Sequence, residues 1–440
     1  MSERPRLTVI GTGYLGATHA VCMAELGFEV LGLDVEQGKV DKLNSGEVPF
    51  HEPGLPELLQ KNLDTGRLRF TTSYDELGAF GDVHFLCVGT PQKKGEMAAD
   101  MAYVDAAFTS LVPVLREGAL VAGKSTVPAG TAERLAAQLD RDAKVSGVEL
   151  AWNPEFLREG FAVEDTLTPD RLVFGVRSEL AETKLREAFA PVIDIPTPVV
   201  VTDFATAQLV KVAANAFLAT KISFINAMAE VCEATGGDVT QLSKALSYDT
   251  RIGGRFLHAG LGFGGGCLPK DIRAFMARAG ELGVDQALSF LKEVDAINLR
   301  RRARMVDLAR EVAGGSFGGM RVAVLGAAFK PNSDDIRDSP ALDVAATIQR
   351  QGAAVTVYDP AAMENARVLH PELGYRESAL DAARGADLVL HLTEWAEFRE
   401  MDPAKLGEVV AGKHIVDGRN ALDPVAWRAA GWTYRALGRP

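Results

Sequence analysis

Short apolar runs alternate with longer segments of helical periodicity along most of the chain. Leu7–Ile10 is the first apolar run; a glycine turn follows, and apolar residues then continue at helical spacing to about Leu26. A second apolar run, from Glu29 to Leu33, ends in Asp34. Apolar runs of this length, bounded by turn residues, are typical of buried strands. A strand, a helix and a second strand in this order predict a βαβ unit with parallel strands.

The same alternation continues toward the middle of the chain and returns near its C-terminus. Further strands are expected at 83–88, 120–124, 150–152, 321–325, 354–358, 388–392 and 414–417. Between them the pattern is helical from Phe204 to about Glu233 and from Leu288 to Val312. These elements predict an α/β fold of two Rossmann-like domains, joined by a central helical region with a long connecting helix. The expected domains are 1–203, 204–313 and 314–440, with the glycine-rich segment 314–319 as a linker.

Composition and charge exclude several classes of protein. The chain has 440 residues, of which 47% are hydrophobic, and a formal net charge of −12 at pH 7. This negative balance argues against a general nucleic-acid or membrane binder, and no uninterrupted apolar run reaches the roughly 18 residues of a membrane span. The four cysteines and seven histidines are scattered, which predicts neither a disulfide framework nor a metal site. Because a strand follows directly after Arg6, we expect no signal peptide and a cytoplasmic protein.

The turn after the first strand has the spacing of a dinucleotide-binding fingerprint. Gly11, Gly13 and Gly16 lie between the strand and the helix, and Asp34 ends the second strand. The first glycine allows the tight turn, the second lets a pyrophosphate approach, and the third allows close helix packing. A carboxylate at Asp34 would bind ribose hydroxyls and repel a 2′-phosphate, so the sequence favours NAD over NADP. The alternative is a Rossmann-like fold that binds no dinucleotide.

A glycine-rich segment, 262–271, contains the cysteine whose surroundings are best suited to a nucleophile. Cys267 follows three consecutive glycines, and a helix is expected from Asp271 to Leu282. A helix N-terminus and the charge of Lys270 both favour the thiolate, which is the nucleophilic form of cysteine. The alternative is a buried structural cysteine beside a tight turn.

Polar residues gather at strand ends and on one helix. The segments 89–91, 125–131 and 153–160 each follow an expected strand, at the edge where open parallel sheets bind ligands. The third segment carries two carboxylates four residues apart, and a solvated loop is its alternative reading. Lys211 and Asn215 are also four residues apart, on an apolar helix, and therefore share one face. Such a pair is suited to holding an oxyanion, although a lysine there could merely extend along the surface.

The second Rossmann-like domain lacks the glycine fingerprint. Only Gly326 remains of the glycines, and Lys330 stands in the segment that follows it. Arg419 follows the expected strand 414–417, again at a strand end. A pyrophosphate bound here would be met by basic side chains and not by a glycine turn. The basic run 300–304 in the long helix is expected to be a solvated or ion-paired surface, because it is short and the chain is acidic.

Together these segments resemble the UDP-glucose 6-dehydrogenase family of NAD-dependent nucleotide-sugar dehydrogenases (the UDP-glucose/GDP-mannose dehydrogenase family). The resemblance covers nearly the whole chain and rests on the segments 125–128, 153–160, 251–253, 262–271 and 329–331, together with Arg337. Gly266 departs from the family, which often has serine at this position. This departure is expected to loosen the loop but leaves the thiol in place.

The resemblance implies two oxidations of a primary alcohol to an acid, through a thiohemiacetal and a thioester on the cysteine. By resemblance the catalytic residues are Cys267, Lys211, Asn215, Asp271, Glu155 and Thr126. The residues expected to bind NAD are Gly11, Gly13, Tyr14, Leu15, Gly16, Asp34, Lys39, Thr90, Thr126, Glu159, Lys270 and Arg337. The residues expected to bind substrate are Phe156, Leu157, Arg158, Lys211, Asn215, Arg251, Phe256, Gly264, Lys330 and Arg419.

The resemblance also implies a substrate and an assembly. The segment 251–253 looks more like the branch of the family that oxidises UDP-glucose to UDP-glucuronate, with NAD bound by the first domain and UDP by the third. The alternatives are a sibling enzyme acting on GDP-mannose or a UDP-N-acetylhexosamine, and a catalytically silent nucleotide-sugar sensor. A homodimer is expected in which Arg251 reaches the neighbouring subunit's site. Neither a nucleic acid nor a membrane is expected as a partner.

Overall fold

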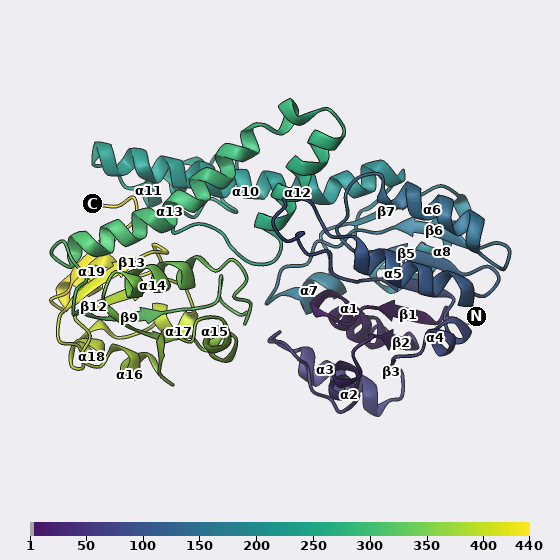
Figure 1. The fold of residues 1–440 in the computed structure, drawn as a ribbon, viewed down its shortest axis with the longest axis horizontal. Coiled ribbons are helices and arrows are strands. Elements are labelled where there is room, and N and C mark those ends of the chain that lie inside the picture. The colour runs from purple at the N-terminus through teal and green to yellow at the C-terminus, as the bar shows by residue number, and fades with distance from the viewer. Residues whose placement is uncertain (1–3) are drawn as a thin grey trace. The chain divides into compact units, whose positions relative to one another are not determined.

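A computed structural model describes residues 4–440 (Figure 1). The chain divides into two compact units. The N-terminal unit runs to Ala214 and includes Arg273–Leu282, and the C-terminal unit consists of Asn215–Ile272 and Gly283–Pro440. Helices α10 (Phe204–Thr235) and α12 (Leu268–Glu281) each contribute residues to both units.

The N-terminal unit is built on an eight-stranded sheet of order β3-β2-β1-β4-β5-β6-β7-β8. Its strands are β1 (Leu7–Ile10), β2 (Val30–Leu33), β3 (Leu68–Thr71), β4 (Val83–Leu86), β5 (Leu120–Gly123), β6 (Glu149–Trp152), β7 (Leu172–Val176) and β8 (Val199–Thr202). Neighbouring strands run parallel except β6 and β7. Because β1 lies between β2 and β4, the strand order reverses at their carboxyl ends, which is where such sheets bind ligands.

Helices cover this sheet and complete the unit. They are α1 (Tyr14–Glu25), α2 (Gln37–Asn44), α3 (Leu55–Asp64), α4 (Tyr74–Phe80), α5 (Ala102–Leu111), α6 (Thr131–Asp142), α7 (Ala162–Leu167), α8 (Glu179–Ala188) and α9 (Ala190–Ile193), with a 3₁₀ turn η1 (Val112–Val114). Successive strand residues enter different cores: Val30 belongs to one buried cluster and Leu31 to another. This follows from the two-residue period of a strand, so the sheet has a core on each face.

The C-terminal unit contains a six-stranded parallel sheet of order β11-β10-β9-β12-β13-β14. Its strands are β9 (Arg321–Leu325), β10 (Ala354–Tyr358), β11 (Gly374–Tyr375), β12 (Leu388–His391), β13 (His414–Asp417) and β14 (Thr433–Ala436). The helices around it are α14 (Pro340–Arg350), α15 (Met363–Leu369), α16 (Ala379–Ala383), α17 (Ala396–Arg399), α18 (Pro403–Gly407) and α19 (Pro424–Ala429). One apolar cluster unites the sheet with its helices and with part of α13 (Phe290–Val312).

The central helices are α10, α11 (Val239–Ser247), α12 and α13, with a 3₁₀ turn η2 (Asp285–Leu288). Helix α10 is long and apolar enough to cross a membrane by length and composition, although the length of the apolar runs in the sequence predicted no such segment. Its most apolar window has a mean hydropathy of 1.3 and is 44% buried within the structure. Long core helices meet the same criterion.

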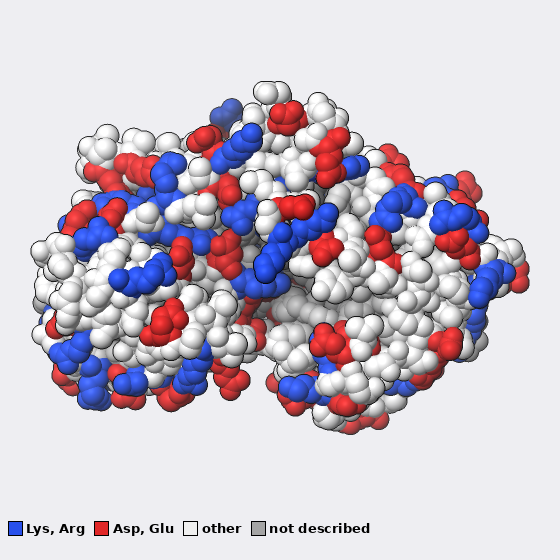
Figure 2. All heavy atoms as spheres, in the orientation of Figure 1, with Lys and Arg blue, Asp and Glu red and all other residues white. Residues whose placement is uncertain are grey.

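The predicted α/β fold of two Rossmann-like domains and a central helical region is confirmed, with shifts at element ends. The helix after Cys267 begins at Leu268 and not at Asp271, so the thiol lies directly before its first turn. Within the basic run 300–304, Arg301 is fully buried and pairs with Glu230 and Glu233, so only part of this run is surface. Elsewhere, basic and acidic side chains are mixed on the face shown in Figure 2.

Candidate functional site

The turn between β1 and α1 has the geometry that a dinucleotide requires. Gly11 has a φ of +85°, which favours glycine, and a Cβ at Gly16 would lie 1.8 Å from the Gly11 carbonyl oxygen. A Cβ at Gly13 would meet nothing within 4 Å. The turn therefore presents open space over the N-terminus of α1, where no side chain caps the helix. These residues fit the pyrophosphate of NAD.

Asp34 stands beside this turn at the end of β2. Its Oδ2 accepts hydrogen bonds from the backbone nitrogen of Thr12 at 2.9 Å and the Thr12 hydroxyl at 3.1 Å. Lys39 Nζ lies 3.5 Å from the same oxygen. The carboxylate is therefore fixed next to the turn, and the positive charge of Lys39 lies close enough to offset part of its negative charge.

Two neighbouring loops meet beyond β4 and β5. The Thr90 hydroxyl donates to the carbonyl oxygen of Thr126 at 2.7 Å, and the Ser125 hydroxyl donates to that of Val88 at 2.6 Å. The structure thus brings together Thr90 and Thr126, which sequence analysis selected separately. Both lie at the ligand-binding edge of the sheet.

The loop after β6 contains a buried ion pair. Lys211 Nζ on α10 lies 2.9 Å from Glu155 Oε1, and their side chains are only 6% and 12% exposed. The same nitrogen lies 5.6 Å from the centre of the Phe156 ring, over which it makes a cation–π contact. The backbone nitrogen of Leu157 donates to Glu155 Oε2 at 2.6 Å. Lysine, carboxylate and aromatic ring therefore form one group in the N-terminal unit.

The remainder of this loop is more exposed. Arg158 forms an ion pair with Asp165, its Nη2 lying 2.5 Å from Asp165 Oδ1. Burial raises the pKa of the Tyr14 phenol, and the neighbouring Glu52 carboxylate and then the charge of Glu159 raise it further. The loop after β6 and the helix that begins at the glycine turn are therefore neighbours.

Cys267 is the exposed thiol of the chain, whereas Cys22, Cys87 and Cys232 are buried. Burial raises the pKa of both Cys22 and Cys87 to about 12, which leaves these thiols protonated and inert. Cys267 precedes α12, and its carbonyl oxygen accepts from the Asp271 backbone nitrogen at 2.9 Å. The structure contradicts the reading of Cys267 as a buried structural cysteine.

Asp271 joins two other predicted residues near the start of α12. Its carboxylate is 2% exposed and accepts from Asn215 Nδ2 at 2.6 Å and from Lys270 Nζ at 2.5 Å. Lys270 therefore shares its charge with Asp271 and does not act on the thiol as an isolated cation. Asn215, Lys270 and Asp271 form a second local group, in the C-terminal unit.

The loop before Cys267 is held by side chains from α10 and α13. The Asn226 side-chain oxygen accepts from the Gly260 nitrogen at 2.9 Å. Asn298 pairs with the backbone of Phe263 twice, accepting at 2.7 Å and donating at 2.9 Å. Arg301 donates to the Gly260 carbonyl oxygen at 3.3 Å. These hydrogen bonds take the place of the helix or sheet hydrogen bonds that this irregular, buried backbone does not form.

The segment after β9 lies along the last glycines of the same loop. The Gly265 nitrogen donates to the carbonyl oxygen of Arg337 at 2.8 Å, and the Gly266 nitrogen donates to Asp335 Oδ2 at 3.2 Å. A Cβ at Gly264 would lie 2.3 Å from the Asp338 carbonyl oxygen. The glycines therefore allow two backbones to touch beside Cys267.

Arg419 connects three loops of the C-terminal unit. Its guanidinium donates to the carbonyl oxygens of Leu392 at 2.7 Å, Phe329 at 2.9 Å and Gly262 at 3.1 Å. Lys330 Nζ lies 5.5 Å from the centre of the Phe329 ring. The predicted residues Arg419 and Lys330 thus lie at the same sheet edge, close to the cysteine loop.

Two other predicted substrate residues have unusual settings. Phe256 has a φ of +65°, which is rare for a bulky side chain and often marks a functional position. Arg251 pairs with Asp249 at 2.7 Å within its own chain, and its side chain is 87% exposed. Arg251 therefore projects from the surface and is available to a partner.

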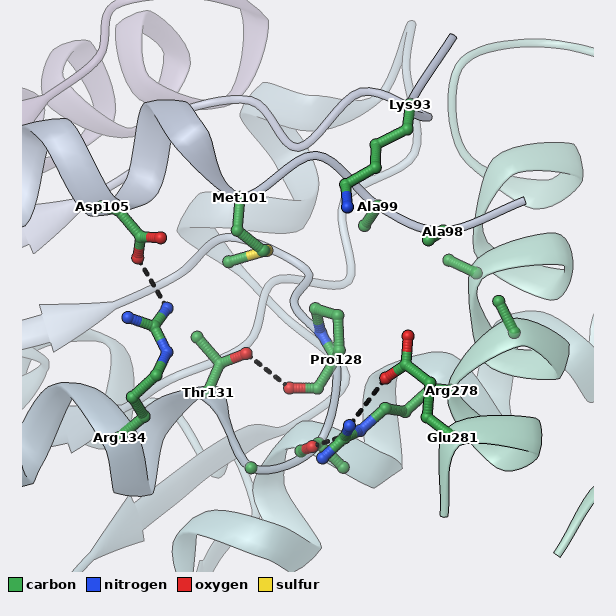
Figure 3. Close-up of a pocket in the computed structure, with 14 residues that line it drawn as sticks. Lys93, Ala98, Ala99, Met101, Asp105, Pro128, Thr131, Arg134, Arg278 and Glu281 are labelled. Carbon is green, nitrogen blue, oxygen red and sulfur yellow. Dashed lines mark hydrogen bonds and ion pairs between the residues drawn. The ribbon is translucent and has the colours of Figure 1, made fainter. Parts of the chain in front are cut away.

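Two cavities lie in the part of the chain that the structure describes, one in each unit. One of about 480 Å³ in the N-terminal unit is shown in Figure 3, where Arg134 pairs with Asp105 and Arg278 with Glu281. Another of about 570 Å³ in the C-terminal unit is lined by α11 and by Arg419. Of the residues described, neither lining includes Cys267. Only the second cavity touches a predicted site residue.

Besides Asn226 and Arg301, the structure adds four residues that sequence analysis did not select. Lys124 is buried and donates to Asn153 Oδ1 at 2.9 Å, and burial lowers its pKa. Glu52, Asn298 and Asp335 each hold a loop of the site through backbone nitrogens. A lysine directly before the Ser125 segment was a usable signal for Lys124. The other three are polar residues without a spacing pattern. Within residues 4–440, no group of three His, Cys, Asp or Glu side chains is arranged to hold a metal ion.

Comparison with known proteins covers nearly the whole chain. Residues 5–193 match the NAD binding domain of the UDP-glucose/GDP-mannose dehydrogenase family, residues 205–300 its central domain and residues 323–424 its UDP binding domain. A UDP-glucose 6-dehydrogenase of Rhizobium meliloti (strain 1021) is 40% identical over 437 residues, which are 99% of this chain and 100% of that protein.

Solved structures give the same result. A UDP-glucose dehydrogenase from Pyrobaculum islandicum superimposes with a TM-score of 0.91 at 38% identity, covering 100% of this chain and 99% of that one. A UDP-D-ManNAc dehydrogenase from Pyrococcus horikoshii superimposes with a TM-score of 0.86 at 28% identity, covering 99% of each chain. From these matches, together with the glycine turn and the cysteine loop, we conclude that the chain belongs to the UDP-glucose/GDP-mannose dehydrogenase family and is an NAD-dependent oxidoreductase.

Proposed function

We propose that the protein oxidises UDP-glucose at C6 to UDP-glucuronate in two NAD-dependent steps. The observation that carries the proposal is the exposed thiol of Cys267, directly before α12 in a loop fixed by hydrogen bonds at both ends. The choice of UDP-glucose is supported by relatives of that activity at 38–40% identity over the full chain. A relative named for UDP-D-ManNAc is less similar, at 28%.

The chemistry centres on the thiolate. NAD held at the glycine turn 11–16 would supply the hydride acceptor for each of the two oxidations. After the first, Cys267 Sγ attacks the aldehyde carbon and forms a thiohemiacetal; its oxidation gives a thioester. Water then attacks the thioester carbon, the C–S bond breaks, and the thiolate is released with the acid. Overall, one substrate, two NAD⁺ and one water give one acid, two NADH and two protons.

The two local groups supply the polar residues for these steps. We assign Lys211 and Asn215 to stabilising the oxyanion that develops at C6, a task for which buried, fixed donors are effective. Asp271, held by Asn215 and Lys270, is assigned to proton transfer through water. Glu155 and Thr126 are assigned to positioning or activating water. The Lys211–Glu155 contact supports the pairing of a donor with a base in one place.

The proposed binding residues divide between the cofactor and the substrate. We assign NAD to Gly11, Gly13, Tyr14, Leu15, Gly16, Asp34, Lys39, Thr90, Thr126, Glu159, Lys270 and Arg337. We assign the UDP-sugar to Phe156, Leu157, Arg158, Lys211, Asn215, Arg251, Phe256, Gly264, Lys330 and Arg419. The domain division 1–203, 204–313 and 314–440 is proposed with these roles, supported by the order of the three family domains. A cytoplasmic location is proposed because the substrate and cofactor are cytoplasmic metabolites.

An assay with a panel of nucleotide sugars tests the function. NADH should form with UDP-glucose in a ratio of two per substrate consumed, and much more slowly with GDP-mannose and UDP-N-acetylmannosamine. Faster turnover of either of these would identify a sibling activity. Binding of UDP-glucose with no NADH would identify a nucleotide-sugar sensor.

Alanine variants of the four cysteines test the mechanism. Cys267→Ala should abolish acid formation while UDP-glucose still binds. Cys22→Ala, Cys87→Ala and Cys232→Ala serve as matched controls, because these thiols are buried away from solvent, and each should keep most of the activity. An active Cys267→Ala variant would remove the thioester from the mechanism.

We further propose a homodimer in which Arg251 serves the neighbouring subunit's site. Phe217, Phe224 and Val231 lie seven residues apart on one face of α10 and are 66%, 48% and 52% exposed. An apolar stripe of this kind suits a two-fold contact between copies of α10. Arg251→Ala and Cys267→Ala proteins should each be nearly inactive, and mixing them under conditions of subunit exchange should restore one working site. Exchange without recovery of activity would refute the role of Arg251 across the interface.

A further inference from the structure

Glu52 is a buried carboxylate to which neither the fingerprint nor the cysteine chemistry assigns a task. Its side chain is only 2% exposed and lies in the segment before α3. Three donors converge on it: the Tyr14 hydroxyl, the Gly160 backbone nitrogen at 2.7 Å and the Ala162 backbone nitrogen at 2.8 Å. We call these four residues the Glu52 cluster. They come from three segments that are far apart in the sequence.

The Glu52 cluster is fully satisfied, which explains how a carboxylate is tolerated there. Burying an ionised carboxyl is costly unless hydrogen bonds compensate it. Burial of the ring, followed by the neighbouring Glu52 carboxylate, raises the pKa of Tyr14 far above its usual value, so the phenol keeps its proton and donates it. The Gly160 nitrogen also lies 3.1 Å from the Tyr14 oxygen, which closes the cluster into a ring of contacts.

The cluster joins two parts of the site. Tyr14 follows Gly13 and is the first residue of α1, at the turn that fits the NAD pyrophosphate. Gly160 ends the loop that carries Glu155, and its φ of +77° fixes a sharp turn into α7. Helices α1 and α7 also pack against each other. A change in the position of Tyr14 therefore requires a change at Gly160, because both bind the same carboxylate.

We propose that Glu52 is a positioning residue that couples occupancy of the NAD turn to the conformation of the 153–160 loop. A ligand that favours one arrangement of the α1 N-terminus then favours the matching arrangement of the loop, and UDP-glucose binds more tightly when the cofactor is present. This inference rests on the proposed function for the role of the loop toward substrate. A purely structural Glu52 would stabilise the fold but leave the two ligands independent.

The test measures coupling without turnover. Calorimetry gives the Kd of UDP-glucose with and without saturating NADH, a pair that cannot exchange a hydride. Glu52→Gln replaces one acceptor oxygen by an NH₂ group that cannot accept from the Gly160 or Ala162 nitrogen. Tyr14→Phe removes only the hydroxyl. Glu57→Gln is the matched control, because Glu57 is exposed in the first turn of α3.

In the parent protein and the Glu57→Gln control, we expect NADH to lower the Kd of UDP-glucose by at least about fivefold, the lower end of typical coupling. In Glu52→Gln and Tyr14→Phe the ratio should fall to within about twofold of one. UDP-glucose alone should still bind to both variants, and NADH alone should still bind to Glu52→Gln. An unchanged ratio in the two variants, or no coupling in the parent, would overturn the proposal. If Glu52→Gln does not fold, the Kd ratio measured for Tyr14→Phe tests the proposal by itself.

Amide hydrogen exchange distinguishes an error in the proposed coupling between the NAD turn and the 153–160 loop from an error in the proposed function. NADH alone should slow exchange in the peptide that contains Gly160 and Ala162, and this protection should be lost in Glu52→Gln. If UDP-glucose does not bind the parent at all, the substrate assignment is wrong, yet this NADH-dependent protection still tests the cluster. Equal protection in parent and variant would refute the role of Glu52.

Discussion

The three glycines before Cys267 should tolerate a side chain very unequally. A Cβ at Gly264 would lie 2.3 Å from the backbone oxygen of Asp338, which can move only with its chain. At Gly265 a Cβ would lie 2.7 Å from the Phe329 ring, and the φ of +82° is itself unfavourable for alanine. At Gly266 the nearest atom, 2.2 Å away, belongs to the Arg337 guanidinium, the end of a flexible side chain that is 64% exposed.

The expected costs follow from these neighbours. Gly264→Ala should destabilise the protein by about 1–3 kcal/mol through overpacking. Gly265→Ala should cost about 2–5 kcal/mol, because a left-handed backbone adds about 1–2 kcal/mol to the same overpacking. Gly266→Ser, which restores the residue often present in the family, should cost less than about 1 kcal/mol, since the side chain that must move is the exposed, flexible Arg337.

Thermal unfolding and initial NADH formation measure the two effects. For a unit of this size each kcal/mol corresponds to roughly 2–4 °C in Tm. A displacement of Cys267 by about 1 Å lowers the rate about 100-fold, so Gly264→Ala and Gly265→Ala should lose activity as well. Gly280→Ala is the control, because its Cβ would meet nothing within 4 Å and its backbone is helical. A Gly266→Ser variant as unstable as Gly265→Ala would refute this reasoning.

Three further outcomes are expected. Asp34→Ala should narrow the preference for NAD over NADP in kcat/KM, because the carboxylate that repels a 2′-phosphate is removed; equal use of both cofactors by the parent would contradict this. Lys211→Ala should lower kcat by roughly 10²–10³ with a smaller effect on substrate affinity, and a change in KM alone would make Lys211 a binding residue. Burial opposes ionisation of Asp417, but the neighbouring His391 and backbone donors outweigh burial and lower the pKa of its carboxyl group. The ionised carboxylate therefore stabilises the fold at pH values above its pKa in the unfolded chain, which is about 3.9. This stabilisation is lost as the pH falls through the lower pKa of the folded protein. The stability gap between parent and Asp417→Asn in urea unfolding should therefore shrink below about pH 4, and a constant gap would show that Asp417 acts without its charge.

The sequence determined the features that depend on local chemistry. Gly11 and Gly265 adopt backbone φ values that other residues rarely adopt, and a glycine in the sequence indicates such a position. The short apolar runs located the strands, and the four strands Leu7–Ile10, Arg321–Leu325, Ala354–Tyr358 and His414–Asp417 match their expected bounds. The spacing of Lys211 and Asn215 correctly placed both on one continuous helix.

Only the tertiary structure decided which side chains meet. Glu155 pairs with Lys211 across 56 positions of sequence, and Glu52 binds Gly160 across 108. Asn298 on α13 holds the loop residue Phe263 across 35 positions. None of these pairs has a spacing that local geometry would reveal, because each results from the folding of distant segments onto one another. Local propensity fixes where a chain turns, whereas the partners of a buried charge depend on the order of strands and the packing of helices, which no single segment contains.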